Sequence, residues 1–326
     1  MEDQKTAQQI PEVPEIARIP GAEERSVTLD GVTLRYWSVG SGPALLLLHG
    51  FMGYSFSWRF NVARLAEHFS VYAIDLPGCG FSQRPPETLE CTLAADAEAV
   101  LRFMDHFGID EADIVASSRG GGLTMVLAGL LARRNSLHRM RKAVLVSPIN
   151  PWSRYGQFLT RILATKPGGF GVLHVLPRLH FMTALYLRKL YGDPRRISPG
   201  TIEGYSAGLQ PAGTFKHLLR IVRSWNCDLR EIEEALPVIS DLPALLLWGS
   251  RDRAVYPSSA PELQRRLKNS TLRIFDGVGH LPYEEVPKEF NDAVCDFLLK
   301  DGLPTPGPRR ESLEQPVSAG GDQSGK

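Results

Sequence analysis

Short, unbroken apolar runs recur along the chain, and segments with helical periodicity separate them. A strand that is buried on both faces has this appearance, because neither of its sides meets water. Strands that alternate with helices form parallel sheets through right-handed crossovers. We therefore predict an α/β fold, with a mostly parallel central sheet and helices on both of its faces. The predicted buried strands are Ala44–Leu48, Val71–Ile74, Ile114–Ala116, Ala143–Val146, Ala244–Trp248 and Thr271–Phe275.

The alternation lapses over residues 151–236, where helical and aromatic patterns contain no strong strand signal. We interpret 151–236 as a helical cap that is inserted into a core formed by 26–150 and 237–301. The core begins with an antiparallel hairpin that has one solvated face. Residues 1–25 are rich in prolines and charges and are predicted to be a mobile leader. Residues 302–326 contain almost no large apolar side chain and are predicted to be a disordered tail.

Composition and charge restrict the class of protein. At 326 residues, of which 43% are hydrophobic, the chain can bury a large core without disulfides. A net charge of +1 gives no general attraction to nucleic acid. No segment resembles a signal peptide or reaches the ~20 apolar residues of a membrane helix, so we expect a cytoplasmic protein. Four cysteines lie far apart and suggest neither a zinc site nor a disulfide framework: Cys79, Cys91, Cys227 and Cys295.

The stretch Asp113–Gly122 carries the strongest chemical signal. A short apolar run ends at two serines, glycines follow, and a helical pattern begins. A nucleophile elbow has this layout of strand, sharp turn and helix, and it needs small residues two positions before and two positions after the nucleophile. Ser118 meets this requirement through Ala116 and Gly120, whereas Ser117 would place bulky residues there. An ordinary polar loop before a helix is the alternative interpretation.

A serine hydroxyl needs a base to accept its proton, and the base needs an acid to orient it. His280 follows the last predicted strand, and Asp252 follows the Ala244–Trp248 strand. Loops after parallel strands gather at one edge of a sheet, so these side chains can meet Ser118 there. Asp276, four residues before His280, is the rival acid. If the two residues take no part in catalysis, the alternative interpretation is that His280 caps a helix and that Asp252 pairs with a neighbouring arginine.

Acyl transfer also needs hydrogen-bond donors for the negative charge that develops on the carbonyl oxygen. The backbone N–H of Arg119, directly after the nucleophile, is one predicted donor. The loop after the Ala44–Leu48 strand supplies the other, and Phe51 is our candidate. A plain strand-ending turn would explain His49–Gly50 equally well. This chemistry requires no metal or organic cofactor, and the histidines of the cap show no metal-binding spacing.

Five ordered segments together resemble the α/β-hydrolase superfamily over nearly all of residues 26–300. The resemblance implies the fold of that family, with Ser118 as nucleophile, Asp252 as acid and His280 as base. It also implies that the backbone amides of Phe51 and Arg119 bind the oxyanion, and it gives Asp75 only a structural role in a turn. The segments are LLLLHGFMGYSFSW at 45–58, IDLPGCGFS at 74–82, VASSRGG at 115–121, LWGSRD at 247–252 and GVGHLP at 277–282.

We therefore predict a serine hydrolase that cleaves small-molecule carboxylic esters through an acyl-enzyme. The serine argues against dehalogenation and epoxide opening, which relatives perform with an aspartate nucleophile. Carbon–carbon bond hydrolysis and acyl transfer by the same triad are alternatives, and a ligand-binding protein on a hydrolase fold is the alternative of another class. The motifs specify neither the substrate nor the oligomeric state.

The cap is basic, because 151–225 holds eleven Lys or Arg residues against two acidic residues. Within it, Phe170–Tyr191 mixes large apolar side chains with three cations. One interpretation is a helix that buries its apolar face on the core. The other is a surface that makes weak contact with an anionic membrane.

Overall fold

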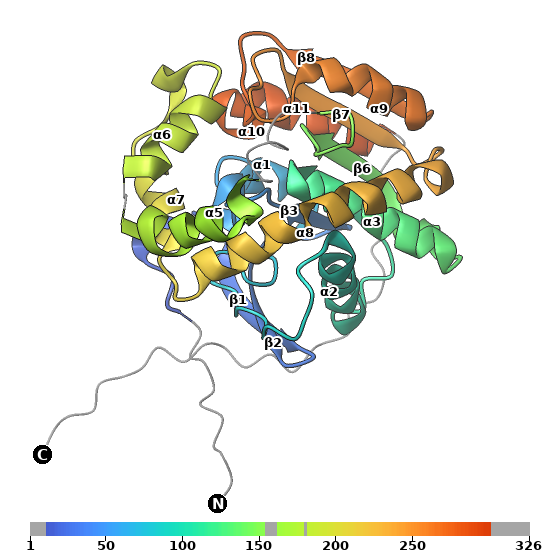
Figure 1. The fold of residues 1–326 in the computed structure, drawn as a ribbon. Coiled ribbons are helices and arrows are strands. Elements are labelled where there is room, and N and C mark those ends of the chain that lie inside the picture. Colours follow the sequence, from blue (N-terminus) through green and yellow to red (C-terminus); the bar gives the residue numbers. More distant parts are fainter. Residues whose placement is uncertain (1–10, 154–161, 179–180, 301–326) are drawn as a thin grey trace, which may run out of the picture.

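The computed structural model describes residues 11–153, 162–178 and 181–300. Within these residues, eight strands form one sheet in the order β1-β2-β4-β3-β5-β6-β7-β8 (Figure 1). The pairs β1–β2 and β2–β4 are antiparallel, and all other neighbours are parallel. The strands are β1 Glu23–Leu29, β2 Val32–Val39, β3 Ala44–Leu48, β4 Ser70–Ile74, β5 Ala112–Ser117, β6 Met140–Val146, β7 Ala244–Gly249 and β8 Ser270–Phe275.

Helices cover both faces of this sheet (Figure 1). The helices of the predicted core are α1 Val62–Leu65, α2 Leu93–His106, α3 Arg119–Arg133, α9 Ala260–Arg266, α10 Pro282–Glu285 and α11 Pro287–Leu299. Leu46 and Leu48 of β3 pack into one apolar cluster with α2 and α3, whereas Leu45 and Leu47 pack into another with α1 and α11. Successive strand residues point to opposite faces, so a strand between two helical layers must be apolar throughout. The predicted α/β fold is confirmed.

Short 3-10 turns connect several of these elements. One of them, η2 before α1, holds Ser57, which lines the site described below. The turns are η1 Glu15–Ala17, η2 Ser55–Trp58, η3 Leu137–Arg139, η5 Leu176–Arg178, η6 Pro194–Arg196, η7 Leu236–Val238 and η8 Pro257–Ser259.

The expected mobile leader is wrong for residues 11–25, and residues 1–10 lie outside the described residues. The described part contains η1 and continues directly into β1. Its apolar residues pack against the same cluster as α1 and α11. The buried side chains are Val13, Ala17 and Ile19.

The hairpin prediction is correct for the pairing of β1 with β2, but not for a solvated face along β2. Arg35, in the middle of β2, is buried, and its Nη2 donates a hydrogen bond to Pro11 O at 3.0 Å. Its Nη1 lies 2.5 Å from Glu24 of β1. The leader therefore covers this face, and the polar residue finds its partners there rather than in water.

The described cap residues form four helices and a π-helical turn. They are α5 Lys166–Phe170, the π-helical turn η4 Gly171–Val175, α6 Phe181–Leu190, α7 Thr201–Leu209 and α8 Thr214–Ala235. The end of α8 lies tightly on α3, since a Cβ added to Gly129 would stand 2.7 Å from Ala235 Cβ. The division into a core and a cap of 151–236 stays a prediction. The predicted tail of 302–326 lies outside the described residues.

Candidate active site

Ser118 stands at the sharp turn between β5 and α3. Its backbone angles, φ +53° and ψ −115°, are costly for a residue that carries a side chain. A Cβ on Gly120 would lie 2.5 Å from backbone oxygens at the end of β3, and one on Gly50 would lie 2.9 Å from Ser118 Cβ. The chain is thus as crowded here as an elbow requires. Ser117, in contrast, belongs to β5 and its Oγ donates to Tyr283 Oη at 3.3 Å.

The loops after β7 and β8 bring Asp252 and His280 into contact. Asp252 Oδ2 accepts a hydrogen bond from His280 Nδ1 at 2.8 Å. Asp252 Oδ1 accepts two more, from the backbone N–H groups of Ala254 at 2.7 Å and Val255 at 2.9 Å. These donors hold the carboxylate in place, and Nε2 remains the ring nitrogen of His280 that can accept a proton. The rival acid, Asp276, accepts instead from a serine hydroxyl at the surface.

Ser118 and His280 line the same cavity and are nearly buried, at 9% and 4% exposure. Among the described residues, no hydrogen bond joins Ser118 Oγ to the imidazole. Contacts between nucleophile and base are often long in unliganded enzymes and shorten when substrate binds. The acid and the base are therefore in contact, and the hydroxyl faces the cavity that the base also reaches.

His49 holds the loop that follows β3. Its Nε2 accepts a hydrogen bond from the backbone N–H of Leu76 at 3.0 Å, and its Nδ1 lies 2.9 Å from Gly50 O. Burial lowers the pKa of His49 to about 4, so the ring is neutral at pH 7. A neutral imidazole fits both partners, because it offers one donor and one acceptor. Sequence reasoning did not identify this role for His49.

The two predicted oxyanion donors flank Ser118 at this loop and at the start of α3. Arg119 is the first residue of α3, so its backbone N–H has no partner within the helix. Phe51 lies in a tight turn closed by a hydrogen bond from Gly53 N–H to Gly50 O, at 3.0 Å. Within the described part of the chain, neither of the two amides donates a hydrogen bond to the protein. Unpaired N–H groups are what a developing oxyanion needs.

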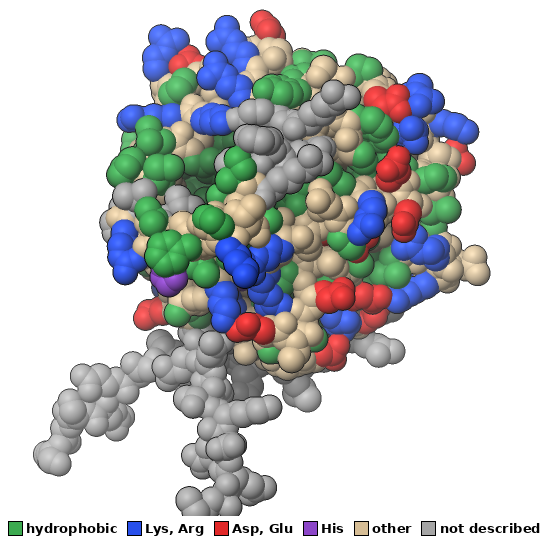
Figure 2. Space-filling view, in the orientation of Figure 1, with side chains coloured by type: hydrophobic (Ala, Val, Ile, Leu, Met, Phe, Trp, Pro, Cys, Tyr) green, Lys and Arg blue, Asp and Glu red, His purple; other side chains and the backbone are tan. Residues whose placement is uncertain are grey.

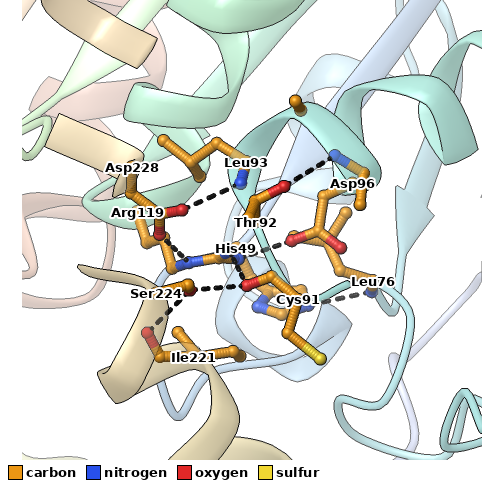
Figure 3. A network of polar contacts seen from close by, with 12 residues as sticks. His49, Leu76, Cys91, Thr92, Leu93, Asp96, Arg119, Ile221, Ser224 and Asp228 are labelled. Atoms are coloured by element: carbon orange, nitrogen blue, oxygen red, sulfur yellow. Dashed lines mark hydrogen bonds and ion pairs between the residues drawn. The ribbon is translucent and has the colours of Figure 1, made fainter. Parts of the chain in front are cut away.

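The side chain of Arg119 lies in a buried ionic cluster that the sequence did not reveal (Figure 3). Its Nη1 lies 2.5 Å from Asp96 of α2, and its Nε lies 3.3 Å from Asp228 of α8. Asp228 also accepts a hydrogen bond from the backbone N–H of Leu93, which begins α2. We name Arg119, Asp96 and Asp228 the Arg119 cluster. One cation faces two carboxylates there, and burial raises the pKa of Asp228 to about 6.

A second buried cluster surrounds Glu284 of α10, four residues after His280. The Glu284 carboxylate lies 2.9 Å from Arg59 Nη2, and it accepts hydrogen bonds from the phenols of Tyr191, at 2.6 Å, and Tyr205. Tyr191 follows α6, Tyr205 belongs to α7, and Arg59 follows η2. We name these four residues the Glu284 cluster. It connects two helices of the predicted cap to the core beside His280.

Backbone contacts also tie the His280 loop to the end of α6. The backbone N–H of His280 donates to Leu190 O at 2.7 Å. Glu285 accepts hydrogen bonds from the N–H groups of Gly279, at 2.7 Å, and Gly192, at 3.0 Å. The position of the imidazole is therefore set partly by the end of α6 and the residues that follow it.

Asp75 has the structural role that the resemblance implies. Its two carboxylate oxygens accept hydrogen bonds from the backbone N–H groups of Ser55 and Phe81, both at 2.8 Å. These bonds fasten two loops near the site and involve no reacting group. Among the described residues, no group of three or more His, Cys, Asp or Glu side chains is arranged to hold a metal ion. All four cysteines are free thiols.

Ser118 lies between two compartments of the cavity. The larger one, of about 210 Å³, is mainly apolar, and the described residues that line it include Lys189 and Arg253 but no carboxylate. The smaller one, of about 30 Å³, lies toward α7 and contains hydroxyl groups of Ser57 and Tyr205. The larger compartment is enclosed by apolar side chains such as Phe51, Ile149, Tyr186, Val222, Trp225 and Leu229.

Comparison with known proteins gives consistent results. A model of the alpha/beta hydrolase family matches residues 45–293. The uncharacterized hydrolase YugF of Bacillus subtilis is 27% identical over 287 residues, which cover 84% of this chain and 97% of YugF. The dihydrolipoyllysine-residue acetyltransferase component of the acetoin cleaving system of Cupriavidus necator is 28% identical over 274 residues, which cover 83% of this chain and 67% of that protein.

Among solved structures, Cfl2 of Burkholderia cenocepacia superimposes with a TM-score of 0.74 at 20% identity, covering 86% of this chain and 97% of that chain. At this identity the likeness shows the fold. None of the helices formed by the described residues combines the length and the hydrophobicity that a membrane crossing requires. The family model, in contrast, spans most of the sequence. The chain belongs to the alpha/beta hydrolase family.

Proposed function

We propose that this hydrolase cleaves carboxylic esters through a triad of Ser118, His280 and Asp252. The observation that carries the proposal is that Ser118 and His280 line one cavity, while Asp252 accepts a hydrogen bond from His280 Nδ1 on the other side of the imidazole. The strained backbone of Ser118 supports it further, since such strain is retained where a side chain must be aimed.

The geometry supports the following sequence of steps. Ser118 Oγ forms a bond to the ester carbonyl carbon while His280 Nε2 takes the hydroxyl proton. Asp252 accepts the Nδ1–H bond and stabilises the imidazolium, and the amides of Phe51 and Arg119 bind the oxyanion. His280 then gives the proton to the leaving alcohol as the carbon–oxygen bond breaks. Water attacks the acyl-enzyme in the same way and returns Ser118 to its free form.

The cavity supports a particular shape of ester. An apolar cavity of about 150 Å³ holds a benzene ring in a well-studied engineered protein. The larger compartment, of about 210 Å³, therefore fits an apolar group of about the size of a substituted ring. The smaller compartment has room for a group of about the size of one water molecule. We expect one large and one small substituent on the ester.

The same acyl-enzyme could pass its acyl group to an acceptor other than water. The relative from Cupriavidus necator is named an acetyltransferase component. Product analysis separates the reactions, because hydrolysis releases a free acid whereas transfer releases the acylated acceptor. Hydrolysis of a dienoic ketone, if faster than that of any ester, would instead favour carbon–carbon bond cleavage.

The decisive experiment replaces Ser118 with Ala, and Ser117→Ala is its matched control. We expect Ser118→Ala to lower kcat/KM for p-nitrophenyl esters by about 10⁴-fold or more and to abolish labelling by a fluorophosphonate. Ser117→Ala removes the hydrogen bond to Tyr283 and one hydroxyl from the lining of the smaller compartment, and it should keep activity within about tenfold of the unmodified protein. Near-full activity of Ser118→Ala, or an equal loss in both variants, would refute the assignment.

A further inference from the structure

The predicted cap exposes a group of large apolar side chains. Eleven large hydrophobic side chains are exposed in the described part of the chain, and five of these lie between residues 162 and 185. Figure 2 shows hydrophobic side chains gathered on the face over α5 and α6. Contiguous apolar surface of this kind marks a contact site more often than scattered residues do. We name this group the cap patch: Ile162 at 44% exposure, Phe170 at 63%, Val175 at 46%, Phe181 at 58% and Leu185 at 49%.

The segment that carries the cap patch contains cations and no acids. Residues 162–190 contain no Asp or Glu. Figure 2 shows Lys and Arg side chains on either side of the apolar surface. Apolar side chains with a cationic rim from the same segment are complementary to a surface that is apolar within and negative at its border. The cations of this segment, all exposed, are Lys166, Arg178, Arg188 and Lys189.

The cap patch also adjoins the active-site cavity. Leu163 and Tyr186, which line the larger compartment, are the chain neighbours of Ile162 and Leu185 in the patch. Lys189 likewise belongs both to the cationic rim and to the lining of the cavity. A surface that contacts the patch therefore lies close to residues that line the larger compartment of the cavity.

We propose that the cap patch docks this protein on an anionic phospholipid surface. Exposed Phe and Leu side chains of an amphipathic segment insert at the boundary between head groups and acyl chains. Anionic head groups attract Lys and Arg side chains, and each such cation increases the partitioning of a protein onto the membrane by about fivefold. The docking goes beyond the proposed function, because it concerns where the protein lies rather than which bond it cleaves.

A second copy of the chain fits the same face less well. A two-fold contact between identical faces would set the cations of one patch against those of the other, with no carboxylate from 162–190 to balance them. An anionic lipid surface brings the opposite sign of charge. The charge of the patch therefore selects the lipid surface over self-association.

Co-sedimentation with vesicles tests the proposal without any need for turnover. The full chain should sediment with vesicles of phosphatidylcholine and phosphatidylserine, and about tenfold less with phosphatidylcholine alone. Phe170→Ser combined with Phe181→Ser should lower binding by about tenfold or more. The matched apolar control is Ile274→Ser, because Ile274 is 47% exposed but lies on β8.

Charge has its own matched pair of variants. Arg178→Gln with Arg188→Gln should lower binding to the anionic vesicles by about tenfold or more. Lys268→Gln with Arg273→Gln removes two exposed cations outside the cap and should leave binding unchanged. Equal binding to both vesicle types, or equal losses in the cap variants and their controls, would overturn the proposal. So would a dimer of the unmodified protein that the Phe170→Ser, Phe181→Ser variant dissociates, because the patch would then be covered by a second copy.

Discussion

The Arg119 cluster and the Glu284 cluster both lie beside the proposed triad, but they balance charge in different ways. In the Arg119 cluster, one guanidinium serves two buried carboxylates. In the Glu284 cluster, one buried carboxylate receives a guanidinium and two neutral phenols. The first therefore has an excess of negative charge, whereas the second has equal charges and additional hydrogen-bond donors.

The clusters also hold different parts of the site. The Arg119 cluster fixes the residue after Ser118 to α2 and α8, and so it supports the turn that aims the hydroxyl. The Glu284 cluster fixes α6 and α7 to the core beside His280. Buried ions are costly to leave unpaired, so each cluster holds its elements in one arrangement. The comparison teaches that hydroxyl and imidazole are positioned by separate networks, and each network can be tested alone.

Arg119→Met should have the largest effect on folding. It removes the only cation of the Arg119 cluster and leaves Asp96 and Asp228 buried without compensation. We expect a loss of about 3–5 kcal/mol in the free energy of unfolding, measured by urea denaturation. Because the backbone N–H of residue 119 is retained, activity below the unfolding transition tests the oxyanion role separately.

A compensating variant shows whether charge is the cause. Arg119→Met combined with Asp96→Asn and Asp228→Asn leaves no buried ion in the cluster, so most of the stability should return. If the triple variant is as unstable as Arg119→Met, the lost packing of the guanidinium is the cause. The difference in charge balance between the two clusters would then not explain their stability.

Tyr205→Phe should have an intermediate effect. It removes one phenol donor from Glu284, while Arg59 and Tyr191 still contact the carboxylate. A hydrogen bond to a charged group contributes about 1.5–3 kcal/mol, which is the loss we expect in urea denaturation. Tyr191→Phe is the matched variant and should cost a similar amount. If Tyr205→Phe loses as much stability as Arg119→Met, the remaining donors do not compensate for the lost phenol, and the two clusters do not differ in the way that we propose.

Patterns along the sequence predicted the elements that depend on burial and on backbone geometry. The strand from Ala244 to Trp248 is unbroken and apolar because helices cover both of its faces. Ser118 was distinguished from Ser117 because tight turns exclude side chains, and Gly120 shows the crowding directly. The choice of Asp252 over Asp276 followed from its position after a buried strand.

The buried charges could not be predicted in this way. Arg119 and Asp228 are 109 residues apart, and Arg59 and Glu284 are 225 residues apart. A charged residue in a helix is usually solvated, and nothing local distinguishes the few that are buried in pairs. The prediction of a mobile leader was wrong over residues 11–25 for a related reason. Its three buried apolar residues are too few to mark a polar segment as ordered, and their partners lie in later parts of the chain.

The smallest predicted effect is a dependence of stability on pH that belongs to the Arg119 cluster. Burial raises the pKa of Asp228 from 3.8 to about 6 in the folded protein. The folded state therefore binds this proton more tightly than the unfolded chain, and the stabilisation is lost as the pH rises through about 6. Between pH 5 and pH 7 the loss should be about 1 kcal/mol. Urea denaturation of the unmodified protein and of Asp228→Asn at both pH values measures it.

Asp113 provides the control, because its pKa is also raised to about 6 by burial although it pairs with Arg141, outside both clusters. The unmodified protein should lose stability from both carboxyl groups between pH 5 and pH 7. Other buried groups such as His49 change stability in the opposite direction over this range, so each variant is compared with the unmodified protein. Asp228→Asn and Asp113→Asn should each remove a loss of about 1 kcal/mol between pH 5 and pH 7. If Asp228→Asn keeps the full dependence, the excess carboxylate of the Arg119 cluster binds no proton in this range. The difference in charge balance between the two clusters would then have no consequence for stability near neutral pH.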